Sequence, residues 1–222
     1  MGSGMTSRLK RLRSAVLATK GRRALHDLIA SFLPYRPIRT SRERWEARYT
    51  EGAWDRLHGI DELARYSIVA GYIQFLAHGA RILDVGCGEG LLSQRLCPNA
   101  CASYLGIDVS AVAIDRANRQ KDAQDSRRDF LAADVETFTT DGKFDVIVFN
   151  ECLYYLPAPV ETLRRYQNFL AANGAMIVSM CESVETKKIW AQIGNRYVAR
   201  DSVVVSNQNH ARWVIKVLDP LR

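Results

Sequence analysis

Residues 82–90 read ILDVGCGEG, and this stretch decides the fold of the chain. It predicts a short apolar strand that ends at Asp84, then a turn with glycines at positions 86, 88 and 90, then a helix near residues 91–97. Because glycine has no Cβ, it lets the backbone turn sharply and approach a ligand closely. A strand that passes into a helix in this way also points backbone N–H groups at the ligand. The stretch therefore predicts a ligand-binding turn in an α/β fold.

A second apolar strand with an acid at its end follows in residues 104–110, YLGIDVS. Asp108 follows Asp84 by 24 residues. In doubly wound nucleotide-binding folds, an acid about 20 residues after the glycine turn accepts hydrogen bonds from the ribose hydroxyls. We therefore expect Asp108 to bind a ribose.

Two further segments complete the pattern of a nucleoside site. Residues 130–135 read FLAADV, where Asp134 can accept a hydrogen bond from an exocyclic amine such as that of adenine. Residues 144–156 read FDVIVFNECLYYL, a buried strand that runs into a polar and aromatic cluster. The ligand-binding residues thus come after successive strands, as they do in open α/β sheets.

From Ala80 onward strands and helices alternate, which predicts an α/β, doubly wound and mainly parallel sheet with helices on both faces. The expected strands lie near 80–85, 103–107, 127–132, 143–149 and 174–180, and the helices after the first lie near 110–121, 159–171 and 184–196. Residues 197–206 and 211–218 alternate like two antiparallel strands around a polar turn at 207–209.

Taken in order, ILDVGCGEG, GIDVS, AADV and FDVIVFNECLYYL resemble the class I S-adenosylmethionine-dependent methyltransferase family, over residues 80–220. The resemblance implies a Rossmann-like, seven-stranded sheet of order 3-2-1-4-5-7-6 with a C-terminal antiparallel hairpin. It also implies S-adenosyl-L-methionine as cofactor and S-adenosyl-L-homocysteine as product. A dinucleotide site is the alternative, but its turn would read G-x-G-x-x-G, whereas these glycines alternate.

The resemblance also assigns roles at the cofactor site. The glycines of the turn approach the methionine part with Asp84 beneath them, Val109 packs on the adenine, and Asn150 offers its backbone carbonyl near the sulfonium. Three alternatives remain: Asp84 as a strand-end cap, Glu89 as a solvated side chain, and Asp134 as part of a surface loop. The expected cofactor-binding residues are Asp84, Gly86, Cys87, Gly88, Gly90, Asp108, Val109, Asp134, Val135, Asn150, Tyr49 and Arg65.

Residues 41–79 are expected to form a helical lid before the core domain of residues 80–222, with helices at 42–49 and 60–77 around a loop at 50–59. Tyr49 and Trp54 are candidates to close on the sulfonium, because an aromatic face attracts a cation; core packing is the alternative. Arg65 is a candidate to clamp the methionine carboxylate as a bidentate fork. A solvated helix face is the alternative for Arg65.

Methyl transfer is an in-line displacement that needs alignment, a dry pocket and removal of the acceptor's proton. The candidate catalytic residues are Glu151, Tyr155 and His58, with His210 as a further candidate base. Many relatives carry a histidine near position 154 or 155, where this chain has tyrosines. The identity of the catalytic base therefore stays open. A missing base would mildly favour nitrogen over oxygen as the methyl acceptor.

The sequence after the fourth strand narrows the acceptor. Residues 150–153 read NECL, which lacks the Asn/Asp-Pro-Pro-Tyr/Phe motif of enzymes that methylate nucleic-acid bases. Glu151 is the only acid there, so we expect a metal-independent enzyme acting on a small molecule or a sugar or glycan precursor. The segment NECLYYL is also similar to nodulation-factor N-methyltransferases and to methyltransferases of bacterial surface-glycan pathways. A lipid-linked, RNA or protein acceptor, and a non-catalytic cofactor-binding partner protein, are the alternatives.

The net charge of +7 is concentrated at one end, with +9 in residues 1–48 and −2 in the rest. Residues 6–33 are expected to form a basic amphipathic arm within an N-terminal region of residues 1–40, where residues 1–4 resemble an expression scar. The arm is either a solvated helix or a contact with an anionic membrane. The near-neutral body argues against a specific nucleic-acid partner.

Five cysteines without a C-x-x-C pair indicate reduced thiols rather than a zinc site. No apolar run is long enough to span a membrane, and no secretory signal is recognisable. We therefore expect a cytoplasmic protein, with peripheral contact at the inner membrane face as an option. The oligomeric state stays open.

Overall fold

A computed structural model describes residues 35, 37, 40–76, 79–97, 101–122 and 125–220. The chain divides into two compact units, residues 1–36 and 37–222. All of the helices and strands that the structure describes belong to the second unit. The predicted arm at residues 6–33 and the scar at residues 1–4 lie outside the described residues.

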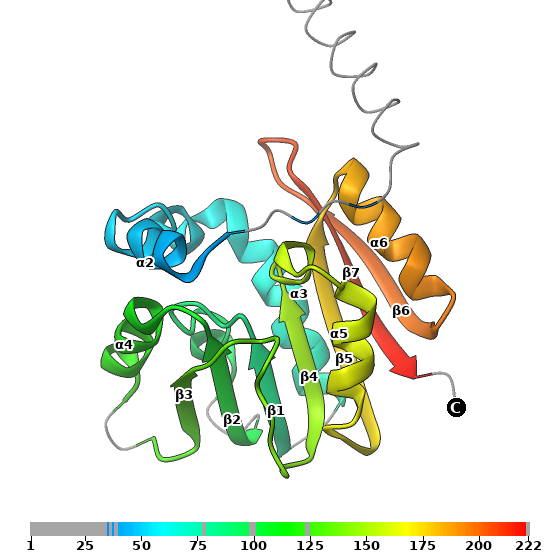
Figure 1. Cartoon of the computed structure of the whole chain (residues 1–222), viewed down its shortest axis with the longest axis horizontal. Helices are drawn as coiled ribbons and strands as arrows, with labels where there is room; N and C mark the ends of the chain where they lie inside the picture. Colours follow the sequence, from blue (N-terminus) through cyan, green and yellow to red (C-terminus); the bar gives the residue numbers. More distant parts are fainter. Residues whose placement is uncertain are drawn as a thin grey trace, which may run out of the picture. The chain divides into compact units, whose positions relative to one another are not determined.

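The second unit is built on one seven-stranded sheet of order β3-β2-β1-β4-β5-β7-β6 (Figure 1). Its strands are β1 Ala80–Val85, β2 Cys101–Asp108, β3 Arg128–Ala132, β4 Phe144–Asn150, β5 Leu170–Cys181, β6 Tyr197–Ser206 and β7 Arg212–Pro220. The pairs among β1 to β5 are parallel, and β7 pairs antiparallel with both β5 and β6. The predicted fold class and strand order are therefore confirmed.

The helical elements are α2 Arg42–Thr50, η1 Asp55–His58, α3 Ile60–Leu76, η2 Ser93–Arg95, α4 Ala111–Gln120, η3 Leu153–Tyr155, α5 Pro159–Gln167 and α6 Val184–Gly194. Helices α2 and α3 flank a loop that contains the single 3-10 turn η1. Side-chain caps start several of them; Ser183 and Thr186 form a capping box at α6.

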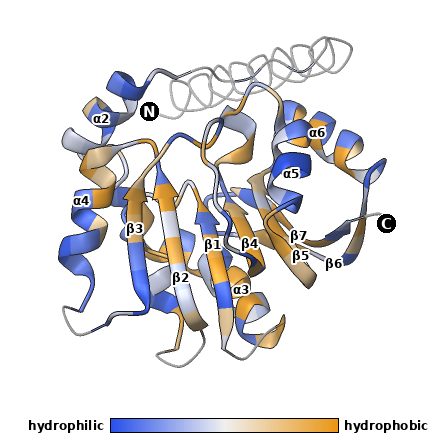
Figure 2. Ribbon diagram, turned by 60° about the horizontal axis from the view of Figure 1, so that its bottom comes forward, coloured by the Kyte–Doolittle hydropathy of each residue, from blue (hydrophilic) through white to orange (hydrophobic). Residues whose placement is uncertain are grey.

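The core follows from the alternation of side chains along the central strands. Ile82, Val146 and Val148 face one side of the sheet, where they form a cluster with Val69 and Ile73 of α3. The alternate residues face the other side, where the ring of Phe149 meets Tyr166 of α5 edge-on at 5.3 Å. Figure 2 shows this apolar character along the central strands. Each fully buried aliphatic side chain stabilises the fold by about 1.5–3 kcal/mol.

The helix predicted at residues 91–97 is wrong, because only the 3-10 turn η2 forms there. Leu91, Leu92 and Leu96 are all buried in the cluster beneath α3. Proline at position 98 also disfavours the helical conformation at the residue before it. The glycine turn is thus followed by a compact apolar loop.

The predicted helix at 159–171 ends early, at Gln167, because β5 begins at Leu170 rather than near residue 174. The pairing of β4 with β5 shifts register between Phe144 and Val146, so β5 carries an irregularity before Ala175. Gly174 lies in this segment, where a Cβ would approach the Phe144 carbonyl oxygen to 2.9 Å. Sequence alternation alone does not reveal such an irregular start.

Among the described residues, no helix combines the length and the apolar character needed to cross a membrane. All of the cysteines are free thiols, as the sequence predicted.

Gly71→Ala is expected to stabilise the protein by about 0.4–1 kcal/mol, because alanine restricts the unfolded chain and suits a helix. Gly71 lies on the exposed side of α3, and nothing lies within 4 Å of an added Cβ. Urea unfolding followed by circular dichroism measures the effect. As the contrast, Gly106→Ala should destabilise, because its Cβ would lie 2.7 Å from Phe130 Cδ1 and 2.8 Å from Cys87 Sγ. A loss of stability in Gly71→Ala would contradict the packing of α3 described above.

Candidate active site

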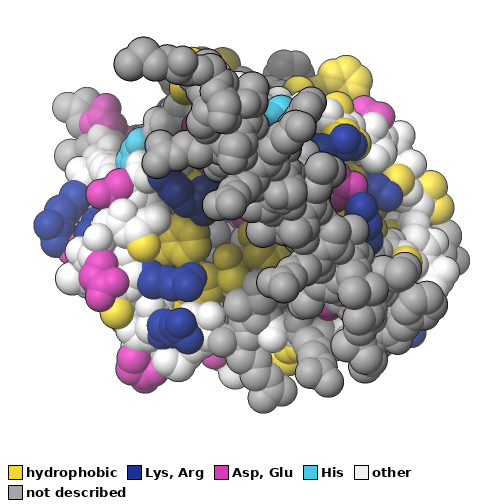
Figure 3. All heavy atoms as spheres, turned by 90° about the horizontal axis from the view of Figure 1, so that it is seen from above, with side chains coloured by type: hydrophobic (Ala, Val, Ile, Leu, Met, Phe, Trp, Pro, Cys, Tyr) yellow, Lys and Arg dark blue, Asp and Glu magenta, His cyan; other side chains and the backbone are white. Residues whose placement is uncertain are grey.

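A cavity of about 460 Å³ opens at the carboxyl ends of the parallel strands. In open α/β sheets ligands bind there, where the chain order reverses between neighbouring strands, and the volume suits a small-molecule site. Here β1 lies between β2 and β4, which makes its end the point of reversal. Figure 3, seen from this side, shows apolar side chains in a hollow with basic side chains beside it.

Most of the residues that the sequence singled out line this cavity. They are Tyr49, Arg65, Gly86, Cys87, Gly88, Asp108, Val109, Asp134, Val135, Asn150, Glu151 and Tyr155. Asp84, Gly90 and His58 are not among the lining residues. The structure thus brings together residues from six segments that are far apart in the sequence.

The glycine turn depends on a backbone conformation that glycine adopts readily. Gly86, Gly88 and Gly90 have φ of 70°, 55° and 74°, in the left-handed region that favours glycine. Space is limited as well, because a Cβ on Gly86 would lie 2.6 Å from Cys152 Cβ and one on Gly88 would lie 2.9 Å from the Tyr49 hydroxyl. The first two glycines therefore keep the wall of the cavity open.

Gly90 has a different role from the one that the sequence predicted. A Cβ there would lie 2.8 Å from Cζ of Phe130 and 3.3 Å from Cβ of Ala117. The third glycine therefore allows the turn to pack against β3 and α4 in the interior. It does not approach the cavity.

Asp108 is fixed at the end of β2 with its carboxylate at the cavity wall. Its two oxygens accept hydrogen bonds from the backbone N–H groups of Gly88, at 3.0 Å, and Ser110, at 2.9 Å. Burial raises the pKa of Asp108 to about 6, against the lowering effect of these hydrogen bonds. A carboxylate can accept more hydrogen bonds than these, so it can still receive ligand hydroxyls.

Asp134 lies after β3 on the exposed side of the cavity. One of its oxygens accepts a hydrogen bond from the N–H of Glu136 at 2.8 Å, which fixes the turn. The next residue, Val135, is buried, and its carbonyl oxygen accepts a hydrogen bond from the Tyr166 hydroxyl at 3.0 Å. This turn therefore presents a carboxylate and an apolar side chain side by side.

Aromatic rings from α2 and η3 meet across the cavity. Trp45 stacks on Trp54 at 5.8 Å and meets Tyr155 edge-on at 4.9 Å, and Tyr49 lies 6.1 Å from Trp54. All four side chains line the cavity. The segment before the core thus contributes Tyr49 and Trp54 to the cavity lining.

Glu46 fastens α2 to the core. Its carboxylate accepts hydrogen bonds from the Ser110 hydroxyl at 2.7 Å and from the N–H groups of Ala111 at 2.8 Å and Val112 at 3.1 Å. These are groups at the N-terminus of α4, where a negative charge is stabilised by the helix dipole and by free N–H donors. The contact holds α2 beside the end of β2.

Glu89 makes a second connection, and the interpretation of Glu89 as solvated is wrong. Its buried carboxylate binds Arg116 of α4 at 2.6 Å and His58 Nε2 of η1 at 3.2 Å. His58 is therefore engaged on the surface rather than presented to the cavity. His210, with φ of 61°, lies exposed in the β6–β7 turn, so neither histidine contacts the cavity.

A family model described as a methyltransferase domain matches residues 76–216 of this chain. The chain belongs to the class I S-adenosylmethionine-dependent methyltransferase family. The dinucleotide alternative is thereby set aside.

The chain is similar to the ubiquinone biosynthesis O-methyltransferase of Coxiella burnetii, with 29% identity over 126 residues that cover 56% of this chain and 53% of that protein. The chain thus spans about half the length of the curated relatives it matches. Its fold is similar to N-methyltransferase NodS from Bradyrhizobium japonicum WM9 in complex with S-adenosyl-L-homocysteine, with a TM-score of 0.65 and 21% identity over 76% of this chain and 92% of that chain. It is also similar to magnesium protoporphyrin IX methyltransferase from Synechocystis PCC 6803 with bound S-adenosylmethionine, with a TM-score of 0.66 and 16% identity over 82% of this chain and 99% of that chain. At these identities the two structures show a common fold.

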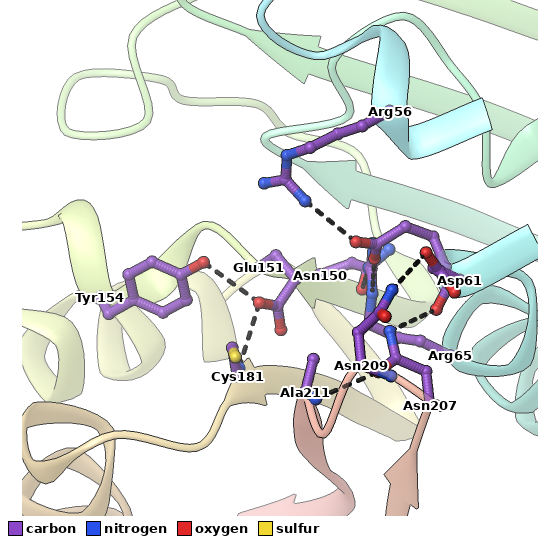
Figure 4. Close-up of polar contacts among 11 residues, drawn as sticks. Arg56, Asp61, Arg65, Asn150, Glu151, Tyr154, Cys181, Asn207, Asn209 and Ala211 are labelled. Atoms are coloured by element: carbon purple, nitrogen blue, oxygen red, sulfur yellow. Dashed lines mark hydrogen bonds and ion pairs between the residues drawn. The ribbon is translucent and has the colours of Figure 1, made fainter. Parts of the chain in front are cut away.

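Arg65 is a buried cation, so the interpretation as a solvated helix face is wrong. Its Nε and Nη2 donate to Glu62 Oε2 at 3.1 and 2.9 Å, and its Nη1 donates to the Asn150 side-chain oxygen (Figure 4). Its guanidinium also lies 4.2 Å from the centre of the Tyr66 ring. The fork that the sequence predicted for a ligand carboxylate is thus taken by Glu62, and the N–H groups that remain on Nη1 and Nη2 are what Arg65 can offer to a ligand.

Glu151 is held in an uncommon conformation at the end of β4. Its φ is 64°, and its N–H donates to the Ser179 carbonyl oxygen at 3.0 Å. Its carboxylate accepts a hydrogen bond at 3.1 Å from the Ser179 hydroxyl. It also accepts hydrogen bonds at 3.1 Å from the Cys181 N–H and the Tyr154 hydroxyl (Figure 4). Burial raises the pKa of Glu151 to about 7. A non-glycine residue in this backbone region is strained, and such strain often lies at functional sites.

Three residues that support the site were not singled out from the sequence: Glu62, Glu46 and Tyr104. Glu62 lies three positions before Arg65 on one helix, a spacing that brings side chains together and could have revealed the pair. Glu46 lies between the aromatic residues of α2, but nothing in the sequence indicates that it reaches α4. Tyr104 lies inside an apolar strand, where the position of its hydroxyl depends on the neighbouring strand.

Asp84 lies inside the protein at the end of β1, not at the cavity. One oxygen accepts a hydrogen bond from the Tyr104 hydroxyl, and the other, Oδ1, has no hydrogen-bond partner among the described residues. Burial raises the pKa of Asp84 to about 7. The folded protein therefore binds a proton at this carboxylate more tightly than the unfolded chain does.

Because its pKa is raised, Asp84 makes the stability of the protein depend on pH. The stability contributed by the protonated carboxyl group is complete below the unfolded pKa of 3.8 and is lost as the pH rises through about 7. Asp84→Asn stays neutral, so its free energy of unfolding relative to the natural protein should improve from about pH 5 to about pH 8. Urea unfolding at both pH values measures the difference.

Asp145→Asn is the matched control for this experiment. The hydrogen bond from Arg81 lowers the pKa of Asp145, so Asp145 stays ionised throughout the range and its substitution should cost the same at both pH values. A pH-independent effect of Asp84→Asn would contradict the raised pKa of Asp84.

Proposed function

We propose that this protein transfers a methyl group from S-adenosyl-L-methionine to a hydroxyl or amine of a small molecule or of a sugar or glycan precursor. One observation carries the proposal: the ends of β1, β2 and β4, the turn after β3, an aromatic helix and Glu151 all line a single cavity. Membership of the family supports the type of reaction, and the residues that line the cavity fit the cofactor of that reaction. The activity of the whole protein, its acceptor and its partners are proposals.

The hydrogen-bonding groups and apolar side chains of the cavity fit this cofactor. Asp108 would accept hydrogen bonds from the ribose hydroxyls, Asp134 would accept one from the adenine amine, and Val109 would pack on the adenine ring. Gly86 and Gly88 would lie against the methionine part, because no side chain obstructs the approach there. Cys87 and Val135 would complete the wall.

At the other end of the cofactor, Arg65 would bind the methionine carboxylate with its remaining N–H groups, and Asn150 would offer its backbone carbonyl near the sulfonium. S-adenosylmethionine supplies an electrophilic methyl group when it is bound. Tyr49 and the neighbouring aromatic rings would cover this group and exclude water from it. Glu151 and Tyr155 stand next to this position as the candidates that handle the acceptor's proton.

Two observations support a small acceptor. The cavity has the volume of a small-molecule site, and the curated relative is by its name an enzyme of ubiquinone biosynthesis. Glu151 is the acid that follows β4, and it already accepts hydrogen bonds from three protein groups. For this reason we propose that catalysis does not depend on a metal ion.

Asp108→Asn is expected to weaken binding of S-adenosylhomocysteine about tenfold or more, because it removes a charged acceptor of hydrogen bonds. Isothermal titration calorimetry measures the affinity. Asp129→Asn is the matched control, since Asp129 is exposed at the start of β3 and lies outside the cavity lining. Undiminished affinity in Asp108→Asn would remove Asp108 from the proposed ribose site.

Metal independence is tested with a chelator. Candidate metabolite pools are first incubated with the protein and cofactor, and the acceptor is found by the mass gain of one methylene group. Turnover of that acceptor is then expected to be the same with and without EDTA. Loss of turnover that magnesium restores would contradict this part of the proposal.

A further inference from the structure

We propose that the methyl acceptor is a primary or secondary amine, which enters as its ammonium ion and binds between the Glu151 carboxylate and the aromatic rings of Tyr154, Tyr155 and Trp45. The protein would then be an N-methyltransferase. This inference rests on the proposed function and names the substrate class of the same cavity.

The first support is the charge of Glu151. The groups that donate to its carboxylate are a serine hydroxyl, a tyrosine hydroxyl and a backbone N–H, all of them neutral. Within the described part of the chain, no lysine, arginine or histidine lies within ion-pair distance of it. An anionic Glu151 at the cavity wall thus lacks a direct counter-charge, which a bound ammonium ion would supply.

Two arginines that line the cavity are already paired with a different carboxylate. Glu62 receives Arg65 at 2.9 Å and Arg56 at 3.1 Å, so one acid holds both cations (Figure 4). Arg65 also donates to the Asn150 side chain, which holds its guanidinium beside β4. The arrangement keeps Arg65 near Glu151 without pairing the two. Burial raises the pKa of Glu151 to about 7, although the charge of Arg65 acts to lower it.

The second support is the aromatic wall beside Glu151. Tyr154 donates to Glu151, the Tyr154 and Tyr155 rings lie 4.5 Å apart, and Trp45 meets Tyr155 edge-on at 4.9 Å. All of these residues line the cavity with Glu151. Aromatic faces attract cations, and the attraction grows when water is excluded. A carboxylate next to such a wall is suited to recognise an organic cation.

The chemistry of transfer distinguishes an amine from an alcohol here. Glu151 accepts one proton from the ammonium ion, and the freed lone pair of the nitrogen forms the new C–N bond. The S–C bond breaks with its electron pair left on sulfur, and the positive charge ends on the methylated nitrogen, beside the aromatic wall. The proton then passes from Glu151 to solvent. An aliphatic alcohol would need a much stronger base than a carboxylate, even one whose pKa is raised to about 7.

The test compares two small probes of similar shape, benzylamine and benzyl alcohol, in titrations of the S-adenosylhomocysteine-loaded protein near neutral pH. The amine is expected to bind about tenfold tighter than the alcohol or better. Glu151→Gln should abolish this preference by weakening the amine alone. Glu151→Asp, which keeps the charge and tolerates the left-handed backbone, should retain the preference. Glu161→Gln, at an exposed position of α5 outside the cavity lining, is the control and should change neither affinity.

Three results would overturn the inference while S-adenosylhomocysteine still binds: equal affinities of the two probes, an amine preference that survives Glu151→Gln, or no binding of either probe. Retained binding of S-adenosylhomocysteine shows that each variant is folded at the site. Failure of the natural protein to bind S-adenosylhomocysteine at all would instead overturn the proposed function, and this inference with it. The two failures are thus distinguishable.

Discussion

The site depends on the hydrogen bonds that tie the glycine turn to the end of β2. The N–H groups of Gly86 and Cys87 donate to the Ile107 carbonyl oxygen at 2.8 and 3.0 Å, and the N–H of Gly88 donates to the Asp108 carboxylate at 3.0 Å. These bonds continue the pairing of β1 with β2 beyond the strands. They fix the acid at the end of β2 against the open backbone of the turn, and the remaining walls are placed relative to this pair.

The carboxyl groups around the cavity differ in their hydrogen-bond and ion-pair partners, and these partners indicate different roles. Glu46 meets helix N–H groups, Glu89 and Glu62 meet basic side chains, and Glu151 meets only neutral donors. In general, N–H groups and cations stabilise the charged form of a carboxyl group, whereas burial destabilises it. The acids that hold the fold together are thus distinguished from the acid available to a substrate.

Much of the fold and of the cavity wall could be predicted from the sequence, because parallel strands bring their carboxyl ends to one edge. Asp108 and Asp134 follow from strand ends that short apolar runs mark clearly. Two local details could not be predicted: that residues 91–97 form a short 3-10 turn instead of a helix, and that β5 begins at Leu170. Local periodicity reveals neither the packing of residues 91–96 beneath α3 nor a shift in strand register. His58 could not be excluded, because its engagement by Glu89 joins segments distant in the chain. The roles assigned to individual residues at the cofactor stay predictions.

The contact of Glu46 with α4 links ligand access to the cavity with the stability of the first turn of α4. The N–H groups of Ala111 and Val112 obtain their acceptor from α2 and not from a neighbouring residue. Any movement of α2 that uncovers the cavity must therefore leave the first turn of α4 without these partners. Access for ligands and fraying of a helix become the same event. The hydrogen-exchange rates of those two amides accordingly report how often the entrance opens.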